Sequence, residues 1–166
     1  MAGKILEVIA KTLTPEEKDQ MIQDNFQSLG KQQYLIGAQI LVDLLISVQQ
    51  VVSATSYTDL TQFKAGVVSS GGMLEVNANI VMYADNVTAV YGLFVDAETV
   101  PREEVTFGPS VAARASISLR KSIKLGEGQH VIKLKAKVNG ASAIFAETAS
   151  STIGKSSFQI TEILGG

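Results

Sequence analysis

The sequence predicts a mainly β protein, an antiparallel sandwich or jelly roll of about eight strands that follows an N-terminal α-helical segment. Composition changes near residue 50, because residues 1–50 hold one Pro and three Gly, whereas residues 51–166 hold two Pro and eleven Gly. The hydrophobic period changes at the same place, from three or four residues to two. We therefore expect a helical anchor or stalk over residues 1–50 and a β head domain over residues 51–166.

The N-terminal segment carries signals for two helices. Thr-Pro-Glu-Glu at residues 14–17 is typical of a helix start, because the Thr caps, the Pro suits the first helical position and the second Glu completes a capping box. This helix runs to Leu29, and a second one runs from Lys31 to Val48. Apolar residues at alternating spacings of four and three form a heptad seam along the second helix. The seam consists of Tyr34, Ala38, Leu41, Leu45, Val48 and Val52.

Two interpretations of this second helix stay open. Apolar residues occupy most of its sides, and such a helix is buried on most sides. It either packs on the β domain of its own chain, or it lies in an oligomer axis or a socket of a larger assembly. Because Asp43 interrupts the stretch, we expect no membrane span. Glu7 interrupts the first apolar stretch, so we expect no secretory signal peptide.

Apolar and polar residues alternate along the β domain. The clearest runs cover residues 74–82, 111–120 and 130–138, and each is typical of an antiparallel strand with one face on the core. Asn139-Gly140 predicts a type I′ hairpin between two such runs. No alternation of strands with helices is visible, which disfavours the doubly wound nucleotide-binding folds. The strands are expected near 49–55, 62–69, 73–83, 87–96, 111–124, 129–139, 141–147 and 156–164.

The composition argues against several classes of function. Lys and Arg number 14 against 16 Asp and Glu, so the net charge is −2 and we expect no nucleic-acid partner. The absence of Cys excludes disulfides and zinc–thiolate sites. With 46% hydrophobic and 18% charged residues, the chain must cover apolar surface, and a subunit interface is the first place to expect it.

No set of catalytic residues emerges from the sequence. His130 is the only histidine and lies in phase with the apolar side of its strand, where we expect a satisfied core or interface residue. No Gly-x-Ser-x-Gly motif supplies a nucleophile for a triad. The acidic residues between 96 and 104 match no calcium-loop spacing. We therefore expect no enzymatic activity, no cofactor and no metal site.

Two groups of charged residues are candidates for contact with a ligand. Lys133, Lys135 and Lys137 form a ladder on one strand face, which either keeps the sheet soluble or forms a basic patch for an anionic glycan or an acidic partner. Asp96 and Glu98 lie at the acidic loop 97–105, which is either a solvated loop, a cation site or a loop that binds polysaccharide.

Three segments of the β domain share a recurring pattern. Tyr91–Asp96 is an apolar strand end closed by an acid, Gly126–Lys135 is a Gly-x-Gly turn that leads through His130 into a strand, and Ser157–Ile163 is a closing strand with a late Glu. In these segments the chain resembles the trimeric jelly-roll heads of bacteriophage fibres and related virion appendages. The resemblance covers residues 50–164. Ala97 departs from the pattern, because a Gly is common at that position.

The resemblance implies a homotrimer on the surface of a virus particle, made in the host cytoplasm without a signal peptide. It implies a receptor-binding or capsid-decoration task, in which the N-terminal helices attach to other virion proteins of the capsid, neck or tail. The β head then projects outward, and a host-surface glycan is a candidate ligand. The alternatives are a cytokine-like or C1q-like trimeric binding module, whose strand rhythm is similar, and a stand-alone carbohydrate-binding domain.

Overall fold

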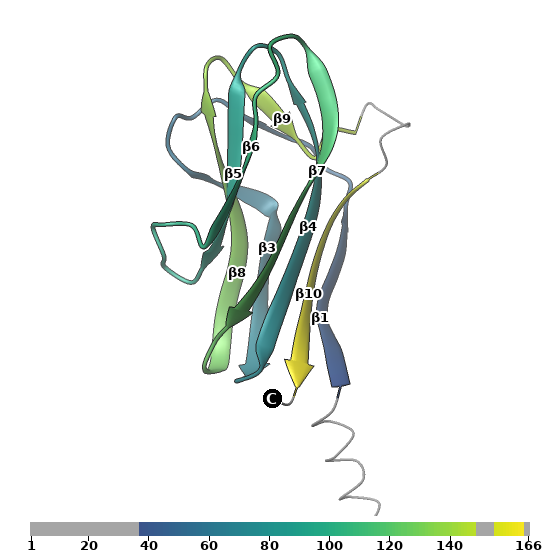
Figure 1. Ribbon diagram of the computed structural model, residues 1–166, viewed down its shortest axis with the longest axis vertical. Coiled ribbons are helices and arrows are strands. Elements are labelled where there is room, and N and C mark those ends of the chain that lie inside the picture. The colour runs from purple at the N-terminus through teal and green to yellow at the C-terminus, as the bar shows by residue number, and fades with distance from the viewer. Residues whose placement is uncertain (1–36, 149–154, 165–166) are drawn as a thin grey trace, which may run out of the picture. The chain divides into compact units, whose positions relative to one another are not determined.

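Figure 1 shows the computed structural model, which describes residues 37–148 and 155–164. These residues form ten strands in two antiparallel sheets that make a sandwich, so the predicted mainly β fold is confirmed. The first sheet contains β1 (Gly37–Ile46), β2 (Gln50–Val52), β4 (Met73–Ala84), β7 (Ala113–Lys124), β9 (Ala143–Phe145) and β10 (Ser156–Leu164). The second contains β3 (Thr58–Ser70), β5 (Thr88–Val95), β6 (Glu103–Phe107) and β8 (Glu127–Asn139).

The strand order gives the sandwich a jelly-roll-like connectivity. In the first sheet β7 pairs with the whole length of β4 on one edge. On the other edge of β4, β10 pairs with its first part and β9 pairs with its last residues. Beyond them, β1 lies beside β10 and β2 lies beside β9 (Figure 1). The second sheet has the order β3-β8-β5-β6. The chain alternates between the two sheets from β2 to β5 and again from β6 to β9, as in a jelly roll, whereas β1 and β2, β5 and β6, and β9 and β10 are consecutive strands of one sheet.

The core lies between the sheets and follows directly from the alternation in the sequence. Every second residue from Leu74 to Ala84 on β4, and from Ile132 to Val138 on β8, is buried. Each large apolar side chain buried in this way contributes about 1.5–3 kcal/mol. Tyr91 is also buried, its hydroxyl donates to the carbonyl of Ile117 at 3.0 Å, and burial raises its pKa.

The prediction of a second helix is wrong over Gly37–Ile46, because these residues form strand β1 of the first sheet. The run Ile-Leu-Val-Asp-Leu-Leu-Ile is too short and too uniformly apolar for periodicity to separate helix from strand. Its branched residues suit a strand, and pairing with β10 satisfies one edge of its backbone. The predicted first helix and the seam residue Tyr34 lie outside the described residues. Within the described ranges, no helix is long and apolar enough to cross a membrane.

Two smaller expectations also differ from the structure. Asn139-Gly140 carries the chain from β8 in one sheet toward β9 in the other, so it is not a hairpin turn. Only Gly140 has a positive φ there, at 137°, whereas a type I′ turn needs two such residues. The acidic segment after residue 97 also contains an unpredicted strand, β6, whose charged residues suit its place at the edge of a sheet.

Candidate functional site

The lysine ladder lies on the outer face of the second sheet, where two of its members cover aromatic rings. The ammonium of Lys135 lies 4.7 Å from the centre of the Phe94 ring, and that of Lys137 lies 4.3 Å from the centre of the Tyr57 ring. The two rings meet edge to face with their centres 4.9 Å apart. Phe94 is fully buried although it faces away from the core, because Tyr57 and Lys135 pack against it.

Carboxylates hold the same two lysines. Lys135 Nζ lies 3.9 Å from Asp59 Oδ1, and Lys137 Nζ lies 3.5 Å from Glu104 Oε1. The Tyr57 hydroxyl donates to the same Glu104 oxygen. Lys135 and Lys137 thus stabilise a small aromatic cluster on the outside of the sheet, which favours the structural interpretation of this part of the ladder.

Lys133 has a different environment from the other two lysines. It lies directly opposite Lys64 of β3 in the sheet, and like charges at opposite positions repel. Lys64 Nζ is 3.9 Å from Asp59 Oδ2, a carboxylate that it shares with Lys135. No described carboxylate lies within 4.0 Å of the Lys133 ammonium. Three lysines thus share the carboxylates of Asp59 and Glu104, and Lys133 has neither of these carboxylates within 4.0 Å.

Asp96 ties the loop after β5 to β8. It has a φ of 52°, a left-handed conformation that Asp tolerates better than most residues. Its backbone N–H donates to the Val131 carbonyl at 2.8 Å, and its Oδ1 accepts from the Val131 N–H at 2.7 Å. Its Oδ2 lies 2.9 Å from His130 Nδ1, and His130 Nε2 lies 3.1 Å from the carbonyl oxygen of Gly126.

Both nitrogens of the His130 ring have hydrogen-bond partners, as expected of a lone histidine on this strand face, but the residue does not belong to the buried core. Because both ring nitrogens face oxygen acceptors, only the protonated imidazolium donates to both. The hydrogen bond with Asp96, and then the one with Gly126, raise the pKa of His130. The bond with His130, followed by that from the Val131 N–H, lowers the pKa of Asp96. Asp96 and His130 therefore link the β5–β6 loop, β8 and the turn before it.

Glu98 braces the same loop from within. Its Oε1 accepts from the Arg102 guanidinium at 2.6 and 2.9 Å, and its Oε2 accepts from the Val95 N–H at 3.0 Å. The hydrogen bond with Arg102 lowers the pKa of Glu98. Pro101 packs on Gly92 so closely that a Cβ on this glycine would lie 2.7 Å from that of Pro101. Asp96 and Glu98 thus hold their own loop, and no three His, Asp or Glu side chains of the described ranges gather around a metal-sized space.

The residues of the predicted seam do not share one face. Val52 is buried in the core of its own chain, and Leu41 is partly buried against that core. Ala38 is exposed, and Leu45 and Val48 are 64% and 55% exposed. They belong to a larger set of exposed apolar residues on and after β1, which we call the β1 edge. Its large apolar members are Ile40, Leu44, Leu45, Val48 and Val51.

Glu162, the Glu of the third motif, is a buried carboxylate to which the sequence alone assigns no role. It is 1% exposed, and its Oε1 accepts from Ser69 Oγ, the Ser70 N–H and the Gly72 N–H at 3.0, 2.8 and 3.1 Å. Burial opposes ionisation, but these donors outweigh it and lower the pKa of Glu162. Glu162 thereby clamps the β3–β4 turn. The sequence does contain a sign of its burial, because Glu162 follows Phe158 and Ile160 at every second position of β10, on the strand face that is buried.

Comparisons with known proteins show a shared sandwich and no family. No protein-family model and no curated protein matches the chain. Among solved structures, it is similar to the VP2 subviral particle of infectious bursal disease virus, with a TM-score of 0.45 and 10% identity over 78% of this chain and 38% of that one. It is similar to the CBM22-1 xylan-binding domain from Paenibacillus barcinonensis Xyn10C, with a TM-score of 0.43 and 11% identity over 79% of this chain and 99% of that one.

A third similar structure is the enzymatically active domain of tailspike protein 4 from bacteriophage CBA120, with a TM-score of 0.31 and 8% identity over 76% of this chain and 19% of that one. The chain thus spans well under half the length of the capsid and tailspike chains. All three TM-scores are below 0.5, so these similarities carry no argument about the activity of this chain.

Proposed function

We propose that this chain is a non-enzymatic structural protein of a virus particle, a homotrimeric appendage of the phage-fibre or capsid-decoration type. Its N-terminal segment attaches to other virion proteins in the capsid, neck or tail, and its jelly-roll head projects outward and binds a host-surface glycan. The supporting observation is the way in which the three motifs shared with phage heads map onto the fold.

Each of those motifs contributes a polar residue that closes the sandwich. Asp96 ends the first motif and bonds to His130 of the second, which links the β5–β6 loop to β8. Glu162 belongs to the third motif and holds the β3–β4 turn. The polar residues of the shared pattern therefore have a structural role, because they form hydrogen bonds that connect strand ends and turns of the sandwich. This supports common architecture with the phage heads more strongly than alternation alone.

The β1 edge supports the homotrimer. Within the described part of the chain, five large apolar side chains between residues 40 and 51 are exposed. β1 is also an outer strand of its sheet, so one side of its backbone has no strand partner among the described residues. An apolar edge of this kind tends to associate with other chains, and a closed cyclic oligomer covers it without forming a filament.

Size-exclusion chromatography with light scattering tests the trimer. We expect a mass three times the 17.6 kDa of one chain. The double variant Leu45→Asp, Val48→Asp should be monomeric with an unchanged circular dichroism spectrum, since both side chains are exposed. Val100→Asp, at a 73% exposed loop position, is the matched control and should stay trimeric. A wild-type chain that remains monomeric at all concentrations would contradict the trimer.

The virion location needs a separate test. Mass spectrometry of purified particles from the source should detect the chain at a stoichiometry divisible by three. Its absence from the particles would overturn the proposed location. A monomer that is absent from particles and binds saccharides would instead support a stand-alone carbohydrate-binding domain.

A further inference from the structure

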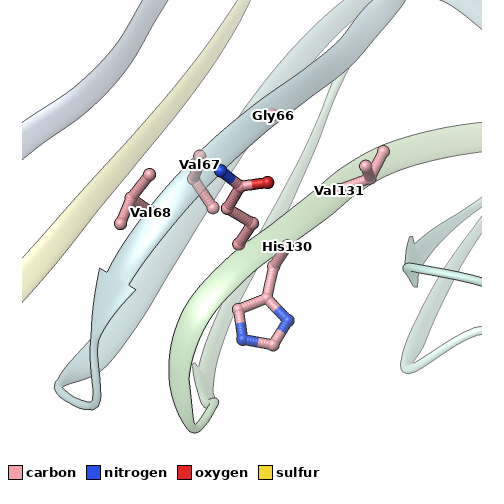
Figure 2. Close-up of a pocket in the computed structure, with 6 residues that line it drawn as sticks. Gly66, Val67, Val68, His130 and Val131 are labelled. Carbon is pink, nitrogen blue, oxygen red and sulfur yellow. The ribbon is translucent and has the colours of Figure 1, made fainter.

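A shallow depression of about 460 Å³ lies between β3 and β8 (Figure 2). Its size falls within the range of small-molecule sites, about 300–1,000 Å³. Both strands belong to the second sheet, and no described residue of the first sheet lines the depression, so it opens on the outer face rather than into the core. The lining residues are Gly66, Val67, Val68, Gln129, His130 and Val131.

Gly66 leaves the floor of this depression without a side chain. A Cβ built on Gly66 meets no described heavy atom within 4 Å. Gly66 pairs with Val131 across the strands, and Val68 pairs with Gln129. Because side chains alternate along a strand, Val68, Gln129 and Val131 project on the outer face around this gap, and Val68 is 67% exposed. A glycine inside a strand weakens it, and one reason to find it there is the close approach of another molecule.

The next cross-strand pair on the outer face is Lys64 and Lys133. It lies two residues from the pair of Gly66 and Val131, on the same outer face, so the two lysines lie beyond one end of the depression. Their repulsion is only partly offset by Asp59, because this carboxylate lies 3.9 Å from Lys64 and is shared with Lys135. An anion held between the two ammonium groups would relieve the repulsion.

We propose that this depression binds one acidic sugar unit of a polysaccharide, with the sugar carboxylate at Lys64 and Lys133 and the ring above Gly66. The two valines offer apolar surface to the C–H face of the ring, and the Gln129 amide both donates to and accepts from hydroxyl groups. Ammonium–carboxylate hydrogen bonds select the acidic sugar over its neutral counterpart. The inference rests on the proposed glycan-binding role and assigns a place and a charge to the ligand.

Isothermal titration with a galacturonic acid trimer tests the site, and the neutral galactose trimer is the matched ligand. We expect the neutral trimer to bind roughly tenfold more weakly, the difference of about one charged hydrogen bond. Binding of the acidic trimer should weaken as salt is raised. Equal affinity for the two trimers, no binding of the acidic trimer, or equal displacement of it by inorganic sulfate would overturn the proposal.

Two variants locate the binding within the depression. Gly66→Val places a side chain in the gap, where a Cβ meets no heavy atom within 4 Å, and valine favours a strand, so the variant should fold normally and lose most of the binding. Lys133→Gln should weaken binding roughly fivefold. Lys124→Gln removes the same charge from β7 of the first sheet and should leave binding unchanged. Unchanged affinity in Gly66→Val would place the ligand elsewhere and overturn the assignment.

The two proposals fail in different ways. A trimer found in particles that does not bind the acidic saccharide overturns the sugar site alone. A chain that binds the saccharide but is absent from virus particles overturns the virion role and leaves the site in place.

Discussion

Glu162 and Lys133 are both charged residues on strands, and they differ in the number of their partners. One oxygen of Glu162 accepts three hydrogen bonds inside the sandwich. Lys133 faces a second lysine across the sheet, with no described carboxylate within 4.0 Å. The three hydrogen bonds of Glu162 stabilise the fold, whereas Lys133, which lies opposite a like charge, is the residue for which we propose contact with a ligand. Variants at both kinds of position make this distinction measurable.

The largest effect is expected at Glu162. Glu162→Ala should lower the free energy of unfolding by about 3 kcal/mol, because the Ser69 hydroxyl and two partly buried N–H groups of the β3–β4 turn lose their acceptor. Glu162→Gln keeps an acceptor oxygen and should cost less. Urea unfolding measures both, with Glu127→Ala at an exposed position as the control. An unfolding midpoint of Glu162→Ala equal to that of the wild type would show that the clamp contributes nothing.

The pH dependence of Glu162 has a defined sign. Its pKa is lower in the folded chain than its ordinary value of 4.5. Its contribution to stability is therefore complete above pH 4.5 and is lost as the pH falls through the folded pKa. The stability difference between wild type and Glu162→Gln should accordingly shrink in acid, which urea unfolding at several pH values can follow.

A smaller effect should separate the two ends of the lysine ladder. Lys135→Thr should destabilise the protein by about 1 kcal/mol, because Phe94 loses the ammonium above its ring. Lys133→Thr should stabilise it by about 0.5 kcal/mol, because the repulsion with Lys64 disappears. Thr suits a strand at both positions, so the pair is matched. The unfolding temperature should fall in Lys135→Thr and rise in Lys133→Thr. Equal shifts in the two variants would contradict the difference between the two lysines.

The smallest effect concerns His130, whose ring signals are easily assigned because it is the only histidine. Proton NMR should give a pKa above the ordinary 6.5, and Asp96→Asn should lower it. The stability that this link adds is complete below pH 6.5 and is lost as the pH rises through the folded pKa. Glu98→Gln, in the same loop without a hydrogen bond to the ring, is the control. A pKa unaffected by Asp96→Asn would remove Asp96 as the cause.

Alternation along the chain predicts the sandwich and most of its strands, because a strand buried on one face must repeat every two residues. It fails at Gly37–Ile46, where an edge strand with apolar residues on both faces has no such period. Alternation also places the lysine ladder on the outer face of a sheet, but it does not identify the residues that contact the lysines. Asp59, Glu104 and Tyr57 reach the ladder from other strands and loops, and their contacts depend on register, which the composition of a single strand does not contain.

The clamp at Glu162 also bears on how the chain folds during synthesis. Ser69 Oγ and Glu162 Oε1 are bonded across 93 residues of sequence. Domains form on the ribosome from the N-terminus, so the β3–β4 turn is made long before the carboxylate that fixes it. Until β10 emerges, the first half of β4 has β7 on one edge but lacks its neighbour on the other edge. A nascent chain stalled before residue 156 should thus expose an open sheet edge, and release of the last residues should convert it to a protease-resistant fold.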